Sequence, residues 1–114
     1  MRVKTLQNPY IIVIVTTPTK QEAENIAQQL LKQQLIACAN ITSPVSSIFP
    51  WKGKQEKAEE HLIIMKTRKD LFQKLTEIVK ALHSYEVPEI LALPIVAGSK
   101  EYLDWLESCL AESQ

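Results

Sequence analysis

The chain has 114 residues, of which 13 are basic, 13 are acidic and 46% are hydrophobic. This length fits a single compact domain with a real core. A net charge of zero lacks the positive excess that nucleic acids and anionic membranes attract, so we expect neither as a partner. The two cysteines form no C-x-x-C pair, which excludes a disulfide framework and a zinc finger.

Cellular location can be judged from the cysteines and the apolar runs. Free thiols at Cys38 and Cys109 suit a reducing compartment. The first ten residues lack the apolar central region of a signal peptide, and no apolar run approaches the ~20 residues of a membrane helix. We therefore expect a cytoplasmic protein with residues 1–9 as an N-terminal extension and one domain over residues 10–113.

The first two predicted elements are a strand and a helix. Residues 10–17, YIIVIVTT, are β-branched and apolar, which predicts a buried strand. Residues 17–34 change to a helical period, and Thr19 and Glu22 match a capping box in which each side chain would bind the other residue's backbone amide. The apolar face of this helix consists of Ala23, Ile26, Ala27, Leu30 and Leu31.

A broken strand, a turn and a second buried strand follow. Residues 35–51 predict a strand that bends or lies at a sheet edge near Pro44 and Pro50, because proline cannot donate to a ladder. Residues 52–60 are charged and contain a glycine, which predicts an exposed turn. Residues 61–67 predict a buried strand.

The last three elements are a helix, a strand and a helix. Residues 68–83 predict a helix with Asp70 as its cap, and residues 89–97 predict a strand. Residues 99–113 predict a final helix capped by Ser99. The apolar stripes are Leu71, Leu75, Ile78, Val79 and Leu82 in the first helix, and Tyr102, Trp105, Leu106, Cys109 and Leu110 in the second.

The element order β-α-β-β-α-β-α predicts an α+β fold. Its first six elements match the ferredoxin-like split βαβ pattern, with four strands in one antiparallel sheet and two helices on one face. The last helix is an addition. This pattern predicts a single sheet whose second face is left uncovered by the first two helices.

The predicted strands are apolar at both odd and even positions, so both faces of the sheet are apolar. In an antiparallel sheet with one solvated face, apolar and polar residues should alternate along each strand. An exposed second face would form an apolar patch larger than soluble monomers usually carry. We therefore predict a homo-oligomer in which a partner subunit covers this face. The alternative is that the last helix covers it alone.

The segment HSYEVPEI, residues 83–90, concentrates polar chemistry between a helix and a strand. In polyproline geometry, His83, Glu86 and Glu89 would lie on one side, with neighbours about 9 Å apart. Such a row is a poor chelate by itself and would need a ligand from elsewhere, such as Cys38 or another subunit. The alternative is a stiff connection that ends the second helix.

Three other positions have both a binding and a structural interpretation. Cys38 could be a soft ligand for Cu(I) or zinc, or an inert buried thiol. Trp51 beside Lys52 and Lys54 could hold an anion, or form a hairpin turn with solvated lysines. Lys66 could serve a site, or extend its charge from an apolar strand to solvent.

Common enzyme motifs are absent. The chain has only two glycines and therefore no glycine-rich phosphate loop, and it contains neither G-x-S-x-G nor H-E-x-x-H. We expect a protein that is not an enzyme and that has no organic cofactor.

Five motifs in order resemble the divalent-cation tolerance family, CutA, over about residues 10–110. They are ACANI (37–41), FPWKGK (49–54), LIIMKT (62–67), HSYEVPEILALPI (83–95) and YLDWL (102–106). The chain departs from the family pattern at Ser84, where a proline is usual. It also departs at Phe49 and Pro50, near which the family usually has a tyrosine.

The resemblance implies a ferredoxin-like subunit in a homotrimer shaped like PII-type signalling proteins, and a link to tolerance of divalent metals, copper above all. It implies Cys38 and His83 as metal candidates. It also implies a cleft between subunits, lined by Trp51, Lys66, Tyr85, Glu86 and Glu89.

Two functions follow from this resemblance. The first is a trimeric, non-enzymatic metal-binding protein for copper or another divalent cation. The second is a PII-like regulatory module that binds a small ligand in the cleft and signals to a protein partner. A structural assembly without a ligand is a third reading.

Overall fold

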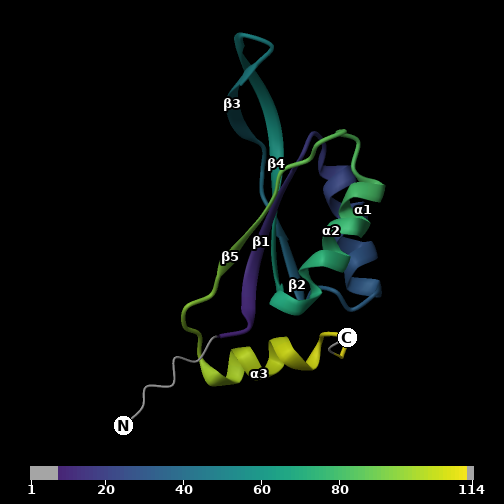
Figure 1. Cartoon of the computed structure of the whole chain (residues 1–114), viewed down its shortest axis with the longest axis vertical. Helices are drawn as coiled ribbons and strands as arrows, with labels where there is room; N and C mark the ends of the chain where they lie inside the picture. Colours follow the sequence, from purple (N-terminus) through teal and green to yellow (C-terminus); the bar gives the residue numbers. More distant parts are fainter. Residues whose placement is uncertain (1–7, 113–114) are drawn as a thin grey trace.

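The computed structural model describes residues 8–112 and shows an antiparallel sheet with two helices on one face (Figure 1). This confirms the predicted α+β class. Among the described residues, no helix has the length and hydrophobicity needed to cross a bilayer. The elements are β1 (Tyr10–Thr17), α1 (Lys20–Lys32), β2 (Cys38–Ile41), β3 (Val45–Trp51), β4 (Lys54–Arg68), a 3₁₀ turn (Lys69–Leu71), α2 (Phe72–Leu82), β5 (Ile90–Pro94) and α3 (Lys100–Ser108).

The sheet is organised around β1 and β4. Its order is β2-β4-β1-β5, and β3 pairs with the first half of β4. β1 pairs with β4 from Tyr10↔Arg68 to Thr17↔His61, and all its pairings are antiparallel. Alternate β1 residues point at the helices and are buried, as are the facing residues of α1 and α2. These core residues include Ile11, Val13, Val15, Ile26, Leu30, Ile63, Met65, Leu75 and Val79.

The predicted exposed turn over residues 52–60 is wrong. β4 begins at Lys54, opposite Trp51, and runs for 15 residues. Only Lys52 and Gly53 form the turn, with positive φ angles of 51° and 78°. Residues 54–59 belong to a two-stranded arm whose two faces are both solvated. Charged side chains are therefore tolerated in this strand, and their polarity made the segment look like a turn in the sequence.

The strand predicted over residues 35–51 is two strands in the structure. Pro44 lies between β2 and β3, which agrees with the predicted interruption. Both strands pair only with β4, so they form an edge of the sheet, as predicted. Pro50 lies within β3 opposite Gln55, where an edge strand tolerates a missing amide donor.

Of the three predicted helix caps, the one at Ser99 is confirmed, the one at Thr19 is confirmed in part and the one at Asp70 is wrong. The Thr19 hydroxyl accepts a hydrogen bond from the Glu22 amide at 3.1 Å, but the Glu22 carboxylate binds elsewhere, so only half of the capping box forms. Ser99 accepts from the Tyr102 amide at 3.2 Å. The cap predicted at Asp70 is wrong, because this residue lies in the 3₁₀ turn and its carboxylate accepts from Arg68 Nε at 2.7 Å.

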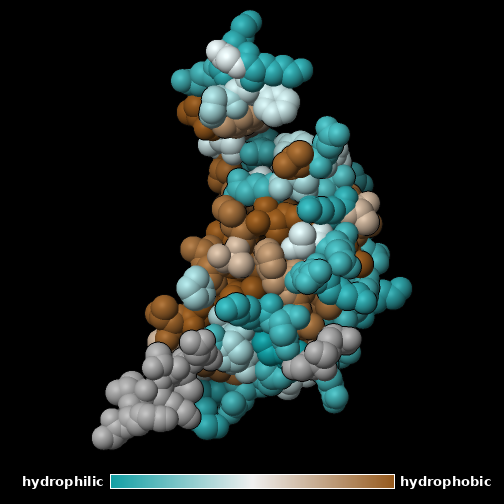
Figure 2. Space-filling model, viewed as in Figure 1, coloured by the Kyte–Doolittle hydropathy of each residue, from teal (hydrophilic) through white to brown (hydrophobic). Residues whose placement is uncertain are grey.

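The face of the sheet opposite α1 and α2, hereafter the open face, is apolar and uncovered by the described chain. Leu91 and Leu93 are 56% and 45% exposed. Ile14 lies between Ile64 and Leu91 in the ladder, so the three side chains share this face. Figure 2 shows hydrophobic side chains gathered over the sheet. α3 lies across one end of the sheet, so the alternative that the last helix covers the open face alone is wrong (Figure 1).

α3 is held at this end by a buried arginine. Arg68 is 5% exposed; its Nη1 donates to Glu107 Oε2 at 2.9 Å and its Nη2 to the Ala111 carbonyl at 2.7 Å. The Tyr10 hydroxyl donates to Glu107 Oε1 at 2.8 Å. Leu106, fully buried, adds an apolar contact. Polar and apolar contacts together fix α3 to the ends of β1 and β4.

Arg68→Met should lower the free energy of unfolding by about 2 kcal/mol, because it removes charge-assisted hydrogen bonds made by a buried group. Unfolding by urea at a fixed protein concentration measures the change. Lys100→Met, which breaks the exposed pair between Lys100 and Asp104, is the matched control and should leave stability unchanged. Equal effects of the two substitutions would contradict this role for Arg68.

Candidate functional site

His83 is a fully buried side chain whose two ring nitrogens are both engaged. Nε2 lies 2.7 Å from the Thr16 carbonyl, and Nδ1 lies 3.0 Å from the Tyr85 amide nitrogen. Because an amide can only donate and a carbonyl can only accept, Nδ1 carries the lone pair and Nε2 carries the proton. Both nitrogens are therefore engaged in this arrangement, and neither is free for a metal ion.

Glu22 ties the loop after α2 to the first turn of α1. Its Oε2 accepts from the Ser84 amide at 2.9 Å and from the Ser84 hydroxyl at 3.0 Å. The same oxygen lies 3.3 Å from His83 Nδ1. A carboxylate that accepts two hydrogen bonds is a strong anchor. Glu22 thus fixes the start of the segment that the sequence singled out.

Tyr85 ties the same loop to the base of the hairpin arm. Its hydroxyl donates to Glu60 Oε2 at 2.7 Å, and Glu60 is buried. Burial, followed by the hydrogen bond to Glu60 and the charges of Glu60 and Glu22, raises the pKa of Tyr85 to about 12. The loop therefore has three attachments: to β1 through His83, to α1 through Ser84 and to β4 through Tyr85.

The segment turns outward after Tyr85. Glu86 and Glu89 are exposed, and Val87 is 86% exposed. His83 points inward, so it does not share an exposed row with the two glutamates. The predicted cleft residues Glu86 and Glu89 thus lie on a surface segment whose beginning is firmly fixed.

Cys38 and Lys66 lie side by side at the β2 edge of the open face. They are opposite each other in the ladder, with Lys66 Nζ 3.9 Å from Cys38 Sγ. Lys66 Nζ also donates to Asn40 Oδ1, and Cys38 Sγ lies 3.7 Å from the same oxygen. We call these three side chains the Lys66 cluster. Asn40 was missed in the sequence, although its position two residues after Cys38 places it on the same strand face.

Trp51 lies far from the other predicted cleft residues of its own chain. It is 59% exposed at the tip of the β3–β4 arm, with Lys52 Nζ 5.9 Å from its ring centroid. Trp51 is opposite Lys54 at the start of β4, and Lys66 lies twelve positions beyond Lys54 in the same strand. At about 3.3 Å per residue the separation is about 40 Å. Trp51 and Lys66 can therefore meet in one site only if they come from different chains.

The two metal candidates are also apart. Cys38 is opposite Lys66, which is opposite Ile12, whereas His83 binds the carbonyl of Thr16. Four residues of β1 correspond to about 13 Å. Within residues 8–112, no three His, Cys, Asp or Glu side chains are grouped in a way that could hold a metal ion. A single chain thus does not assemble a complete metal site from the predicted residues.

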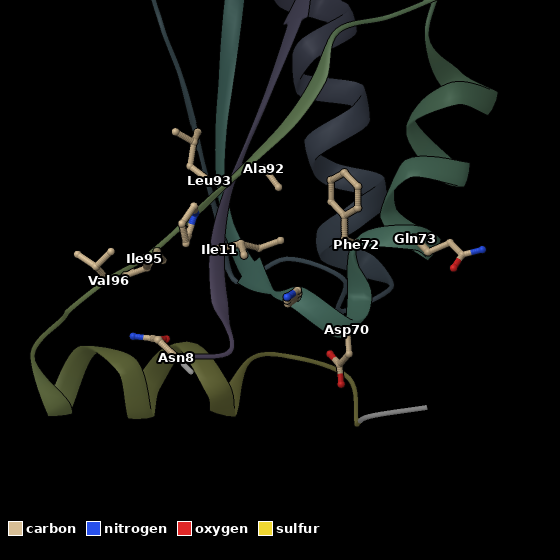
Figure 3. Close-up of a pocket in the computed structure, with 11 residues that line it drawn as sticks. Asn8, Ile11, Asp70, Phe72, Gln73, Ala92, Leu93, Ile95 and Val96 are labelled. Carbon is tan, nitrogen blue, oxygen red and sulfur yellow. The ribbon is translucent and has the colours of Figure 1, made fainter. Parts of the chain in front are cut away.

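An open groove of about 800 Å³ lies between the outer edge of β5 and the start of α2 (Figure 3). In Figure 3, Ile11 and Ala92 of the sheet point toward Phe72 of α2. β5 pairs only with β1, so its outer edge has no strand partner among the described residues. The groove contains none of the predicted site residues, and its apolar walls suit an apolar partner more than an ion. Its lining is Asn8, Ile11, Lys69, Asp70, Phe72, Gln73 and the segment 92–96.

Glu60→Gln should lower the pKa of Tyr85 from about 12 toward its ordinary value of 10.0, because the nearby negative charge disappears while burial remains. Tyrosinate absorbance during a pH titration measures this in a Tyr10→Phe, Tyr102→Phe background, since the pKa of Tyr10 is also raised to about 12 and the pKa of Tyr102 is raised as well. Glu107→Gln, which acts on Tyr10, is the control and should leave Tyr85 unchanged. An unchanged Tyr85 pKa in Glu60→Gln would contradict the assigned hydrogen bond.

The raised Tyr85 pKa also predicts a pH dependence of stability. The native state holds the phenol proton more tightly than the unfolded state, so this stabilisation is complete below pH 10.0 and is lost as the pH rises through about 12. Tyr85→Phe should therefore flatten the loss of stability over this range, as measured by urea unfolding at a series of alkaline pH values. An identical pH dependence in both proteins would refute the assignment.

Glu22→Ala should speed hydrogen exchange at the Ser84 amide on the order of tenfold, because a charge-assisted hydrogen bond of about 1.5 kcal/mol is lost. Glu22→Gln retains an acceptor oxygen and should give an intermediate rate. Glu24→Gln, at an exposed position of the same helix, is the matched control. Mass spectrometry or NMR measures the exchange rate of the Ser84 amide. Equal protection of this amide in all the proteins would contradict the hydrogen bonds assigned between Glu22 and Ser84.

A sequence profile described as "CutA1 divalent ion tolerance protein" matches residues 11–109. The "Divalent-cation tolerance protein CutA" of Thermus thermophilus is 47% identical over 95 residues, which cover 83% of this chain and 92% of that protein. The "Protein CutA, chloroplastic" of Arabidopsis thaliana is 43% identical over 100 residues, or 88% of this chain. The match spans 55% of the Arabidopsis protein, and a match to the "Protein CutA 1, chloroplastic" of Oryza sativa spans 59% of that protein, so this chain covers little more than half of either relative.

Solved structures agree with the sequence comparison. The crystal structure of CutA1 from Oryza sativa superposes with a TM-score of 0.90 at 43% identity, covering 94% of this chain and 98% of that one. The Thermus thermophilus protein gives a TM-score of 0.87 at 44% identity, covering 90% and 99%. The profile match over most of the chain and these relatives confirm the resemblance drawn from the five motifs: the chain belongs to the CutA1 divalent ion tolerance family.

Proposed function

We propose that this chain is a non-enzymatic divalent-metal tolerance protein that works as a homotrimer of ferredoxin-like subunits, similar in shape to PII proteins. The observation that carries the proposal is the family match over residues 11–109, together with the tolerance function named for the Thermus thermophilus and Archaeoglobus fulgidus relatives. Copper is the metal that we propose first.

Assembly is supported by surfaces that one chain leaves incomplete. The open face exposes Leu91 and Leu93, and the β3–β4 arm exposes Ile48 and Trp51 at 60% and 59%. A two-stranded arm without a partner is marginally stable in water, and a strand edge such as that of β5 favours pairing with another chain. Neighbouring copies that cover the open face and receive the arm would satisfy all three features.

The trimer would also assemble the proposed cleft. Because about 40 Å of β4 separates Trp51 from Lys66 in one chain, the arm of one subunit must supply Trp51 to a neighbour. One neighbour would contribute Tyr85 and the exposed Glu86 and Glu89. Lys66 lies six positions, about 20 Å, beyond Tyr85's partner Glu60 along β4, so we propose that it comes from a different copy. The attachments of the loop through Glu22 and Glu60 would hold this wall of the cleft in place.

Cys38 is the residue that we propose as the first metal ligand. A thiolate suits a soft ion such as Cu(I), and Cys38 lies at the edge of the open face. The remaining ligands would come from a neighbouring subunit, since one chain does not group enough of them. His83 can join only if its Nδ1 exchanges the Tyr85 amide for the ion.

Native mass spectrometry of the reduced protein during a copper titration tests subunit number and metal uptake together. We expect a trimer that binds one copper ion per subunit. The Cys38→Ser, His83→Ala double variant should bind none, and each single variant separates the two contributions. Cys109→Ser, which removes the other free thiol, is the matched control and should bind as the unmodified chain does.

Two outcomes would contradict the proposal. A trimer that stays free of copper, or that binds equally in the double variant, would refute this metal site and direct the search to a small ligand in the cleft. A monomer would refute the assembly.

A further inference from the structure

Lys66 is a cation on the open face that forms no ion pair with any acidic side chain among residues 8–112. Its side chain is half-buried, with Cys38 and Ile12 as its cross-strand neighbours. Leu93, opposite Ile12, extends the same row with another apolar side chain.

The two groups that accept from the Lys66 ammonium are both uncharged, so neither balances its charge. The ammonium group has three protons, and its contacts are the Asn40 Oδ1 and the weak acceptor Cys38 Sγ. The thiol of Cys38 also points to Asn40 Oδ1. The amide nitrogen of Asn40 has no hydrogen bond within the described chain, so both of its protons can serve a ligand. The Lys66 cluster therefore offers donors around one positive charge.

Covering the open face would remove this charge from water. A buried ammonium without a counter-charge is strongly unfavourable, and one neutral amide oxygen does not replace an anion. Whatever covers the face must therefore bring negative charge to Lys66.

We propose that the Lys66 cluster binds a carboxylate when the open face is covered in the trimer, an inference that rests on the proposed assembly. A single negative charge matches the single ammonium, whereas a phosphate dianion would leave charge unpaired in an apolar setting. Ile12 and Leu93 suit the methylene groups attached to a carboxylate. The source is either a glutamate or aspartate side chain of a neighbouring copy or a free carboxylic acid.

This binding deepens the proposed metal function. A divalent ion at Cys38 would lie close to the Lys66 ammonium, and like charges at this distance repel. A carboxylate between the neighbouring subunits would neutralise the ammonium and so remove this repulsion, while the Cys38 thiolate and the other ligands would balance the charge of the ion. The carboxylate would thus allow Cys38 to bind a metal ion although Lys66 lies next to it.

The sign of the stability change in Lys66→Met tests the inference. If a carboxylate is bound, methionine leaves it unpaired, and the midpoint of thermal unfolding should fall by about 5 °C. If no anion is present, methionine removes an unpaired charge from an apolar face, and the midpoint should stay or rise. Lys66→Arg keeps the charge and should restore stability. Lys57→Met, at an exposed position of the same strand, is the matched control.

The experiment is done in carboxylate-free buffer and again with added succinate, with native mass spectrometry reporting the oligomer. A lower midpoint for Lys66→Met that succinate does not change assigns the carboxylate to a neighbouring subunit. A midpoint that rises with succinate in the unmodified chain, but not in the variant, assigns it to a free acid. A variant at least as stable as the unmodified chain in both buffers, with no response to succinate, overturns the inference. A monomeric unmodified chain refutes the assembly itself, independently of the sign of the shift.

Discussion

Backbone pairing along β4 is the constraint on which the rest of the molecule depends. This one strand of 15 residues pairs with β3 over its first half and with β1 and β2 over its second half. The same continuous ladder therefore projects a solvated arm and builds the centre of the core. Its length also sets the distance between Trp51 at the arm's tip and Lys66 in the sheet, which makes a shared site a property of more than one chain.

Polar groups fix the two ends of this framework. At one end, Arg68 is buried and binds Glu107 and the Ala111 carbonyl, so that α3 stays across the sheet's end and the open face stays accessible. At the other end, Glu60 accepts the Tyr85 hydroxyl, so that the loop after α2 is joined to the base of the arm. Both anchors are ionic groups in β4 that gain hydrogen bonds from distant segments, which compensates for their removal from water.

The open face connects the fold to the proposed function. Its exposed apolar side chains favour a cover, and the Lys66 cluster lies at its edge. The proposed cover would therefore be apolar, with a negative charge at one point. In the proposed trimer, a second copy of the chain would supply both properties. The same edge carries Cys38, so the proposed assembly, charge compensation and metal binding would all concern one small region of the sheet. This is why subunit contact and ligand binding are expected to be coupled.

The sequence by itself determined the local structure: the buried strands from their apolar β-branched runs, the helices from their periodic stripes, and the caps at Thr19 and Ser99 from their short-range hydrogen bonds. It also determined the family, through five motifs in order.

The tertiary structure decided which distant groups meet. Asp70 binds Arg68 instead of capping α2, Glu22 binds Ser84 instead of completing its capping box, and His83 is enclosed by Thr16 and Tyr85. The charged residues 54–59 became a strand because β3 supplied a backbone partner. Local sequence patterns reflect the propensity and polarity of neighbouring residues. These outcomes depend instead on hydrogen-bond partners that only the pairing of the strands brings close.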